Sequence, residues 1–279
     1  MTLTVLVTGA TGGIGLETAR GLARAGHSVL IHGRNPRKGE AALAALRALG
    51  PGTVRYFNAD FASLAQVRQL AAEVADSAPR LDVLINNAGG ASFRRSVTAD
   101  GYETTFAVNH LAPFLLTNLL LDRLRQSAPA RIVNVASRAH RGQALDFDDL
   151  MSTRGYNVMR VYARSKLANI LFTRTLARRL AGTGVTANCL HPGLVATGIG
   201  QRNELARLVW RTIVYIRGGI PVEEGARTSL YLATSPEVAA ASGGYYSKCR
   251  PAQIQTSAEA VSEAVDERLW RVSAELVGL

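Results

Sequence analysis

Tyr162 and Lys166 are the residues whose types and spacing most directly suggest chemistry. They lie four residues apart, which places both side chains on one face if the segment is helical. Tyrosine is a poor base at its reference pKa of about 10, but the charge of a nearby lysine favours the phenolate and lowers that pKa. Such a tyrosine can exchange a proton with a carbonyl or alcohol oxygen while hydride moves at the carbon. The pair therefore predicts an oxidoreductase that uses Tyr162 as its acid/base.

Ser137 is expected to join this pair. It follows an apolar stretch at 131–136, and its hydroxyl can hydrogen-bond a substrate oxygen and stabilise developing charge. Lys166 can in addition hold the ribose hydroxyls of a nicotinamide cofactor, whose positive charge is expected to act with that of Lys166 in favouring the phenolate of Tyr162. Taken singly, each residue has an ordinary structural alternative: Tyr162 as a packed aromatic, Lys166 as a solvated helix residue, and Ser137 as a loop cap.

The histidines and cysteines do not suggest a metal site. The five histidines are not at ligand spacing with either cysteine, so no metal is predicted. We expect His110 to be structural and His191 to form part of a backbone turn with Pro192. Cys189 lies in an apolar strand pattern and is expected to be a small core residue.

A glycine-rich loop follows the first apolar stretch and leads into a helical segment. Glycine lets the backbone turn tightly and approach a pyrophosphate, and a helix N-terminus offers free N–H groups with partial positive charge. The glycine spacing differs from the common G-x-G-x-x-G register, and a purely structural turn is the alternative. The cofactor-binding residues predicted here are Gly9, Thr11, Gly12, Gly13, Ile14 and Gly15.

Arg34 follows the second strand, where a dinucleotide fold meets the adenosine ribose. An acidic residue there would select NAD(H), but this chain has Gly33 and then Arg34, whose guanidinium can fork onto a 2′-phosphate. NADP(H) is therefore the expected cofactor and NAD(H) the less favoured one, with Asn35 and Lys38 as further contacts. The alternative is that Arg34 is a solvated loop residue.

Further cofactor contacts are predicted directly after the other strands. Asp60 and Phe61 follow the third strand, where Asp60 is placed to receive the adenine amino group. The remaining predicted contacts, after the fourth and sixth strands, are Asn87, Ala88, Gly89, Pro192, Gly193, Val195 and Thr197.

Strands and helices alternate along the chain. Apolar, β-branched stretches occur at 3–7, 28–32, 54–58, 81–86, 131–136, 186–190 and 244–247. Helical periodicity occurs at 14–25, 38–49, 64–76, 104–126, 162–180, 223–233 and 261–279. This alternation predicts an α/β fold: one doubly wound parallel sheet of about seven strands with helices on both faces, forming a single domain over 1–279. The ligand crevice of such a sheet lies at the carboxyl ends of its strands.

These motifs together resemble the short-chain dehydrogenase/reductase family. The motifs are the loop at 8–15, the Asn-Asn-Ala-Gly at 86–89, Ser137, the Tyr-Ala-Arg-Ser-Lys at 162–166 and the His-Pro-Gly at 191–193. Within the family, 162–172, 244–247 and the C-terminal segment are most similar to the retinol-dehydrogenase-like and protochlorophyllide-reductase-like branch. The resemblance implies a Rossmann-type fold.

The resemblance also implies a fourth catalytic residue. Asn109 matches the family asparagine that bends a long helix and holds a proton-relay water. Ala136 stands where a serine is common, which leaves Ser137 intact. Retinol-dehydrogenase relatives often carry an N-terminal membrane anchor, and we expect none here.

Composition excludes several classes of protein. The chain has 279 residues, 47% hydrophobic and 19% charged, which is ordinary for a globular enzyme. No run of eighteen apolar residues and no signal peptide is evident, so we expect a cytoplasmic protein. The net charge of +11 comes from scattered arginines with no nucleic-acid motif, so no nucleic-acid partner is predicted. A homo-oligomer is compatible with the sequence.

The segment at about 194–222 is predicted to be a lid that selects the substrate. It combines aliphatic residues and Trp210 with four arginines, which indicates an amphipathic helix over the crevice and an apolar carbonyl or alcohol substrate. A helix that merely packs on the core is the alternative, and peripheral contact with an anionic membrane is a further hypothesis. A non-catalytic dinucleotide-binding module is the competing functional class, but such proteins usually lose the tyrosine or the lysine.

Overall fold

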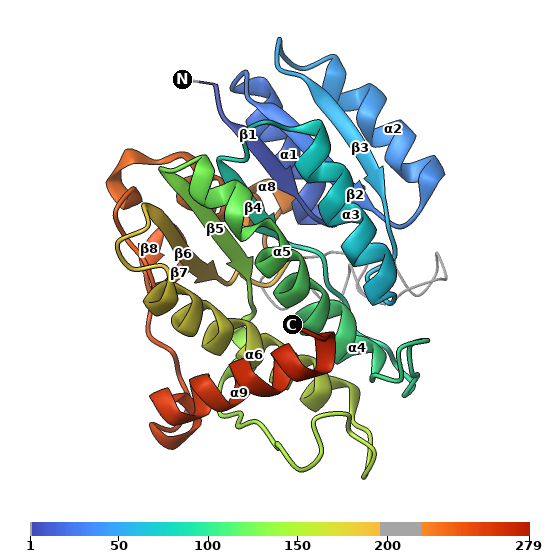
Figure 1. Cartoon of the computed structure of the whole chain (residues 1–279), viewed down its shortest axis with the longest axis vertical. Coiled ribbons are helices and arrows are strands. Elements are labelled where there is room, and N and C mark those ends of the chain that lie inside the picture. Colours follow the sequence, from blue (N-terminus) through green and yellow to red (C-terminus); the bar gives the residue numbers. More distant parts are fainter. Residues whose placement is uncertain (1, 196–218) are drawn as a thin grey trace.

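A single β-sheet forms the centre of the molecule. The structure is a computed structural model that describes residues 2–195 and 219–279. In this part of the chain eight strands pair in the order β3-β2-β1-β4-β5-β6-β7-β8 (Figure 1). Their bounds are β1 (Thr4–Val7), β2 (Ser28–Gly33), β3 (Val54–Asn58), β4 (Val83–Asn86), β5 (Ala130–Val135), β6 (Val185–Leu190), β7 (Tyr245–Ser247) and β8 (Arg250–Pro251). The predicted parallel α/β sheet is confirmed.

The number of strands is a correction to the sequence analysis, which expected about seven. β8 has only two residues and pairs antiparallel with β7 at the edge of the sheet. Pro251 lacks a backbone N–H, and proline is tolerated in a sheet mainly on such an edge. So short a strand shows no alternation of apolar and polar residues, and the sequence therefore did not reveal it.

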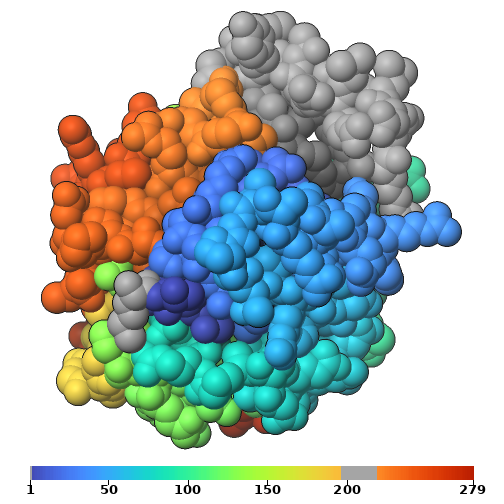
Figure 2. All heavy atoms as spheres, turned by 90° about the horizontal axis from the view of Figure 1, so that it is seen from above, coloured from blue at the N-terminus to red at the C-terminus, as the bar shows by residue number. Residues whose placement is uncertain are grey.

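Helices cover both faces of the sheet. One face carries α1 (Gly13–Arg24), α2 (Pro36–Arg47) and α8 (Val222–Thr234), which bury their apolar residues in one cluster with β1 and β2. The other carries α3 (Leu64–Ser77), α5 (Ala112–Gln126) and α6 (Val158–Arg179), which form a second cluster with the C-terminal helix α9 (Glu263–Val277). Figure 2 shows the N-terminal part of the chain, in blue, beside the segment after residue 218, in orange.

Side-chain caps fix where several helices begin. The Asn157 side chain accepts a hydrogen bond from the Arg160 N–H (3.0 Å), so α6 begins at Val158. The sequence analysis placed this start at 162, which is one turn too late because it followed the apolar periodicity and did not use the cap. Asn35 and Ser63 cap α2 and α3 in the same way. The earlier start places Tyr162 and Lys166 within the first turns of a fixed helix.

The helical segment predicted at 104–126 is present but interrupted. It consists of α4 (Thr104–Phe106), a five-residue π-helical turn at Ala107–Leu111 and then α5. We call Ala107–Leu111 the π-turn. By length and composition Thr104–Gln126 could cross a membrane, with a mean hydropathy of 1.2, but 72% of its most apolar window is buried within the protein. Such burial is typical of a core helix.

Candidate active site

Tyr162, Lys166 and Ser137 meet at the carboxyl end of β5. Ser137 is the second residue after this strand, and its side chain hydrogen-bonds Tyr162. Lys166 donates from Nζ to the carbonyl oxygen of Val135, the last residue of β5 (2.8 Å). The same Nζ lies 5.8 Å from the centroid of the Tyr162 ring. A strand end and the first turns of α6 therefore bring together the three residues that the sequence analysis proposed as a catalytic set.

Burial controls the protonation of this group. It raises the pKa of Tyr162 above its usual value, while the hydrogen bond with Ser137 lowers it by less. Burial also lowers the pKa of Lys166 to about 8, because the side chain is only 4% exposed. The sequence analysis expected Lys166 and the nicotinamide together to lower the pKa of Tyr162, and the protein groups by themselves do not do so. A buried lysine whose own charge is disfavoured does not offset the desolvation of the phenolate.

Asn109 lies in the π-turn and is completely buried. Its Oδ1 accepts from the Gly90 N–H (2.8 Å), and its Nδ2 donates to the Gly90 carbonyl (2.8 Å) and to the Ser165 Oγ (2.9 Å). Ser165 Oγ in turn donates to the carbonyl oxygen of Tyr162 (2.7 Å). Asn109 thus joins the loop after β4 to the first turns of α6. The helix interruption expected at this asparagine is confirmed, because π-turns mark places where a helix is distorted.

Gly89 lies between Asn109 and Lys166. A Cβ at this position would lie 3.0 Å from Asn109 Oδ1 and 3.2 Å from Lys166 Nζ. A larger residue here would press directly on both side chains. Glycine is therefore required at position 89 because of its two neighbours in the site, and not because of the backbone conformation of the loop.

The glycine loop between β1 and α1 is held against the end of β4. Thr8 Oγ1 accepts from the N–H groups of Asn87 and Ala88 (3.0 Å each), and Asn87 Nδ2 donates to the Thr8 carbonyl (2.8 Å). Gly9 has φ +66°, and a Cβ there would lie 2.8 Å from Ala88 Cα. Only glycine fits such a close approach with positive φ.

The start of α1 is open. Gly12 is the N-cap residue, has no side-chain cap, and would have open space around a Cβ. The free N–H groups of a helix N-terminus attract anions through their partial positive charge. With Thr11, Gly13, Ile14 and Gly15 completing the loop, this cradle fits the pyrophosphate of a dinucleotide.

His32 is a residue that the sequence analysis missed. It is 3% exposed, its Nδ1 accepts from the Gly9 N–H (3.4 Å), and its Nε2 pairs with the Ala59 carbonyl (2.9 Å). Its ring stacks on Phe61 with 4.3 Å between centroids, and burial lowers its pKa to about 4. The signal in the sequence was a histidine within an otherwise apolar strand.

The residues after β2 and β3 have distinct positions. Arg34 is exposed at the end of β2, whereas the backbone of Gly33 lies so close to Thr11 that a Cβ would be 2.4 Å from Thr11 Cγ2. Asp60 Oδ1 accepts from the Ala62 N–H (3.0 Å). Phe61 is 3% exposed, so its side chain belongs to the core and a cofactor could meet only its backbone.

Asn35 and Lys38 belong to the first turn of α2. Asn35 Oδ1 accepts from the Lys38 N–H (3.1 Å), so this asparagine side chain is engaged as a helix cap. The Lys38 side chain is exposed. Lys38 can therefore reach a ligand near Arg34, and Asn35 serves mainly to fix the start of the helix.

The segment after β6 forms the predicted turn. His191 Nδ1 accepts from the Gly193 N–H (3.2 Å) next to Pro192, and Gly193 has φ +90°. Val195 is 6% exposed and forms a parallel bridge with Ile220. The remainder of the lid, Thr197 and Trp210 included, lies outside the described residues.

The structural roles predicted for Cys189 and His110 agree with the structure. Cys189 is 1% exposed, and burial raises its pKa to about 12, as expected of an inert core thiol. His110 is completely buried and hydrogen-bonded to side chains of α6 and α9. In residues 2–195 and 219–279 no three side chains of the metal-ligating types gather to hold an ion.

Comparisons with known proteins agree with this geometry. The family model for short chain dehydrogenases matches residues 3–207. Human retinol dehydrogenase 14 is 44% identical over 99% of this chain and 86% of its own length, and mouse retinol dehydrogenase 12 is 44% identical over the same shares. A crystal structure of an uncharacterized protein from Mycobacterium paratuberculosis has a TM-score of 0.78 at 34% identity and covers 99% of this chain and 93% of its own. The glycine loop, the strand order and these similarities together show that this chain belongs to the short-chain dehydrogenase/reductase family of oxidoreductases.

Proposed function

We propose that this protein is an NADP(H)-dependent oxidoreductase that interconverts a carbonyl compound and its alcohol, with Tyr162 exchanging the proton. The observation that carries the proposal is the meeting of Tyr162, Ser137 and Lys166 at the end of β5. Members of the family use NAD(H) or NADP(H), so the hydride carrier is a nicotinamide dinucleotide.

Tyr162, Ser137 and Lys166 each have a separate role in carbonyl reduction. A nicotinamide held by the glycine loop would supply the hydride for the new C–H bond and, with it, the two electrons that reduce the carbonyl. The Tyr162 hydroxyl gives its proton to the carbonyl oxygen, and the raised pKa of Tyr162 keeps that proton in place at neutral pH. Ser137 hydrogen-bonds the same oxygen as negative charge develops on it. Lys166, anchored to Val135, provides a positive charge beside the phenolate that remains.

Preference for NADP(H) is supported by Gly33 and Arg34. An acidic residue at position 33 would accept hydrogen bonds from the adenosine ribose, but any side chain there would have to displace the side chain of Thr11. Arg34 is exposed and next in the chain, and within the described residues it pairs with no carboxylate. An exposed guanidinium at this place fits a 2′-phosphate.

An apolar alcohol or aldehyde is the proposed substrate. Several relatives of this chain carry the name retinol dehydrogenase, which is a name for enzymes of a long apolar alcohol. The predicted lid is rich in aliphatic residues, although most of it lies outside the described residues. A lid of this composition would shield an apolar substrate from water.

Purified protein incubated with NADPH and a series of aldehydes and ketones tests the proposal. We expect oxidation of the reduced nicotinamide with apolar carbonyls, faster with NADPH than with NADH, and loss of turnover in Tyr162→Phe. NADPH binding without turnover of any carbonyl or alcohol would support the non-catalytic module instead. Absence of NADPH binding would overturn the proposal as a whole.

A further inference from the structure

His110 follows Asn109 in the π-turn and has two polar partners from other helices. Its Nε2 lies 2.8 Å from the Ser273 Oγ of α9, and its Nδ1 lies 3.4 Å from the Asn169 Oδ1 of α6. His110 and Ser273 are completely buried, and Asn169 is 5% exposed. Buried polar groups are costly unless they are paired, so this triplet favours one arrangement of the three elements.

The triplet continues as a chain of buried hydrogen bonds toward the sheet. Thr173 Oγ1 donates to the Asn169 carbonyl (2.7 Å) and accepts from Asn134 Nδ2 (2.9 Å). Asn134 Oδ1 in turn accepts from Asn86 Nδ2 (2.8 Å). The chain therefore links α9 and the π-turn to β5 and β4, the strands whose ends carry the site.

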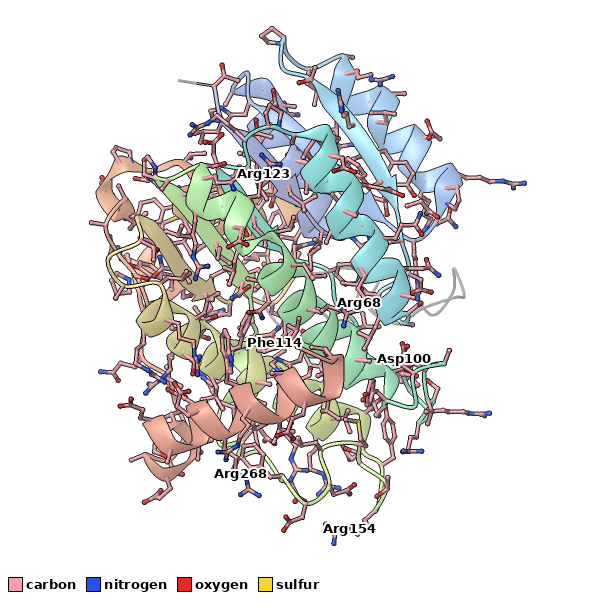
Figure 3. The ribbon with its side chains drawn as sticks, in the orientation of Figure 1. Arg68, Asp100, Phe114, Arg123, Arg154 and Arg268 are labelled. Atoms are coloured by element: carbon pink, nitrogen blue, oxygen red, sulfur yellow. The ribbon has the colours of Figure 1, made fainter. Side chains whose placement is uncertain are left out.

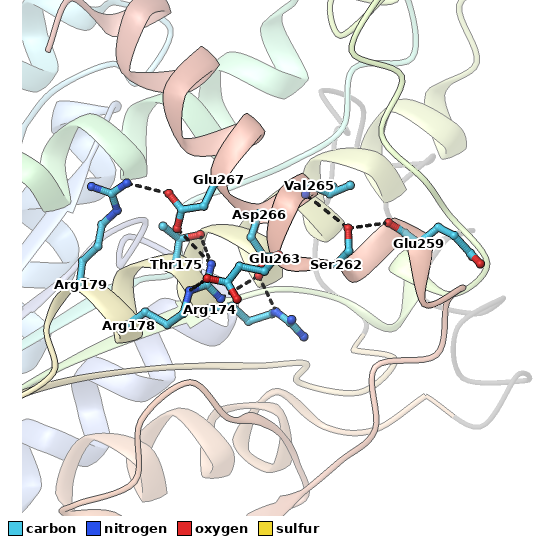
Figure 4. A network of polar contacts seen from close by, with 10 residues as sticks. All are labelled: Arg174, Thr175, Arg178, Arg179, Glu259, Ser262, Glu263, Val265, Asp266 and Glu267. Carbon is cyan, nitrogen blue, oxygen red and sulfur yellow. Dashed lines mark hydrogen bonds and ion pairs between the residues drawn. The ribbon is translucent and has the colours of Figure 1, made fainter.

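Charged contacts attach the N-terminal half of α9 to α6. Asp266, which is fully buried, accepts from Arg174 Nε and Arg178 Nη1 (2.9 Å each). Glu267 pairs with Arg178 (3.2 Å) and Arg179 (2.7 Å), also on α6 (Figure 4). These contacts hold α9 against α6.

Aromatic packing secures the next turns of α9. Trp270 lies 5.0 Å from Phe114 of α5 and 5.7 Å from Phe172 of α6, measured between ring centroids. Figure 3 places Phe114 in the interior where these helices meet. At the end of the helix, Arg68 of α3 donates to the Gly278 carbonyl (3.3 Å). Helix α9 is thus fixed along its whole length, with Ser273 directed at His110.

We propose that Ser273 and His110 form a positioning pair through which the C-terminal helix holds Asn109 in the active site. The proposal rests on the proposed function, because it assigns the pair a purpose through Asn109. A π-turn is a rare interruption of an α-helix that is found frequently at functional sites. His110 ties this turn to α6 and α9, and the residue before it in the same turn orients Gly90, Ser165 and, through Ser165, the backbone of Tyr162.

Ser273→Ala tests the pair directly. Alanine is a good helix former, so the variant removes the partner of His110 without weakening α9. We expect kcat to fall about tenfold, since displacement of a group beside the reacting atoms by about 1 Å can cost up to about a hundredfold. The KM for NADPH should stay unchanged, because the glycine loop is remote from α9. Asn169→Ala removes the other partner of His110. This variant should likewise have a lower kcat and an unchanged KM for NADPH.

Glu267→Gln is the matched control. It weakens the contact of α9 with α6 at Arg178 and Arg179 but leaves His110 and Ser273 untouched. We expect a lower melting temperature and an unchanged kcat. If Glu267→Gln lowers kcat as much as Ser273→Ala does, the effect comes from loosening of the helix and the proposal is wrong. An unchanged kcat in Ser273→Ala overturns it as well.

Hydrogen–deuterium exchange provides a readout independent of turnover. Backbone amides of the π-turn should exchange faster in Ser273→Ala than in the wild type and at the wild-type rate in Glu267→Gln. Equal exchange in Ser273→Ala and the wild type contradicts the positioning role even if no substrate is found. A wild type that turns over no carbonyl, with exchange as expected, would count against the proposed function and leave the pairing of His110 and Ser273 supported.

Discussion

His32 Nδ1 accepts a hydrogen bond from the backbone N–H of Gly9, with 3.4 Å between the two nitrogens. The other ring nitrogen is paired with the Ala59 carbonyl at the end of β3 (2.9 Å). Because Nδ1 must accept, the proton of the neutral ring belongs on Nε2, which then donates to Ala59. A strand histidine therefore connects the first turn of the cofactor loop to two neighbouring strands.

His32→Leu should weaken cofactor binding. The loop loses one hydrogen-bond acceptor at Gly9, and a typical hydrogen bond contributes about 1 kcal/mol, or roughly fivefold in affinity. We expect the KM for NADPH to rise by that factor with little change in kcat, measured by steady-state kinetics. His27→Leu is the control, because His27 Nδ1 accepts from the Leu3 N–H (3.3 Å) at the opposite end of β1. Equal effects in the two variants would show that His32 acts only on stability.

Acid should destabilise the fold through its buried histidines. Burial lowers the pKa of His32 and of His110 to about 4, below the unfolded value of 6.5. Between these values the unfolded chain binds protons that the folded chain does not, so stability falls as pH decreases from about 6.5 to 4. Urea unfolding across this range should show the midpoint decreasing with pH. In His32→Gln the urea midpoint should depend less strongly on pH. If the midpoint of this variant changes with pH as it does in the wild type, His32 is not a source of the acid sensitivity.

Tyr162→Phe should remove most activity without preventing cofactor binding. The variant lacks the hydroxyl that exchanges the proton, and a positioned acid/base contributes about a hundredfold or more to the rate. Turnover and NADPH binding by fluorescence titration measure the two effects separately. Tyr231→Phe removes a hydroxyl that pairs with Glu237 on the far side of the sheet and should leave turnover unchanged. Near-normal turnover in Tyr162→Phe would exclude it as the acid/base.

Arg34→Ala should reduce the preference for NADP(H). A lost hydrogen bond to a charged group costs on the order of 1.5–3 kcal/mol, and only the cofactor with a 2′-phosphate makes this contact. We therefore expect the KM for NADPH to rise far more than the KM for NADH. Arg37→Ala, another exposed arginine three residues along, is the control. A wild type that prefers NADH, or equal losses for both cofactors in Arg34→Ala, would contradict this role.

Trp210→Ala tests the predicted lid, whose central part lies outside the described residues. If this segment contacts the substrate, kcat/KM should fall, and the loss should increase with the chain length of the carbonyl compound, because longer chains bury more apolar surface. The series of carbonyl compounds used for the wild type measures this dependence. Sedimentation with anionic vesicles at low salt tests the membrane hypothesis, and a protein that stays in solution contradicts it.

The sequence by itself determined the features that depend on neighbouring residues. The glycine loop, the four-residue spacing of Tyr162 and Lys166, and the alternation of strands with helices are local patterns, and each was found where predicted. Ser137 was placed correctly at the end of a strand because it lies only two residues beyond the apolar stretch that forms β5. These patterns suffice because turn geometry and helix periodicity are set by residues close together in the chain.

Tertiary structure decided the contacts between residues distant in the chain. His110 and Ser273 are 163 positions apart, and Asn109 and Ser165 are 56 apart, so no local pattern could reveal their pairing. The same holds for protonation: the pKa of Tyr162 is raised because surrounding elements bury it, whereas the sequence showed only a lysine nearby. Desolvation depends on everything packed around a group, and that packing exists only once the chain is folded.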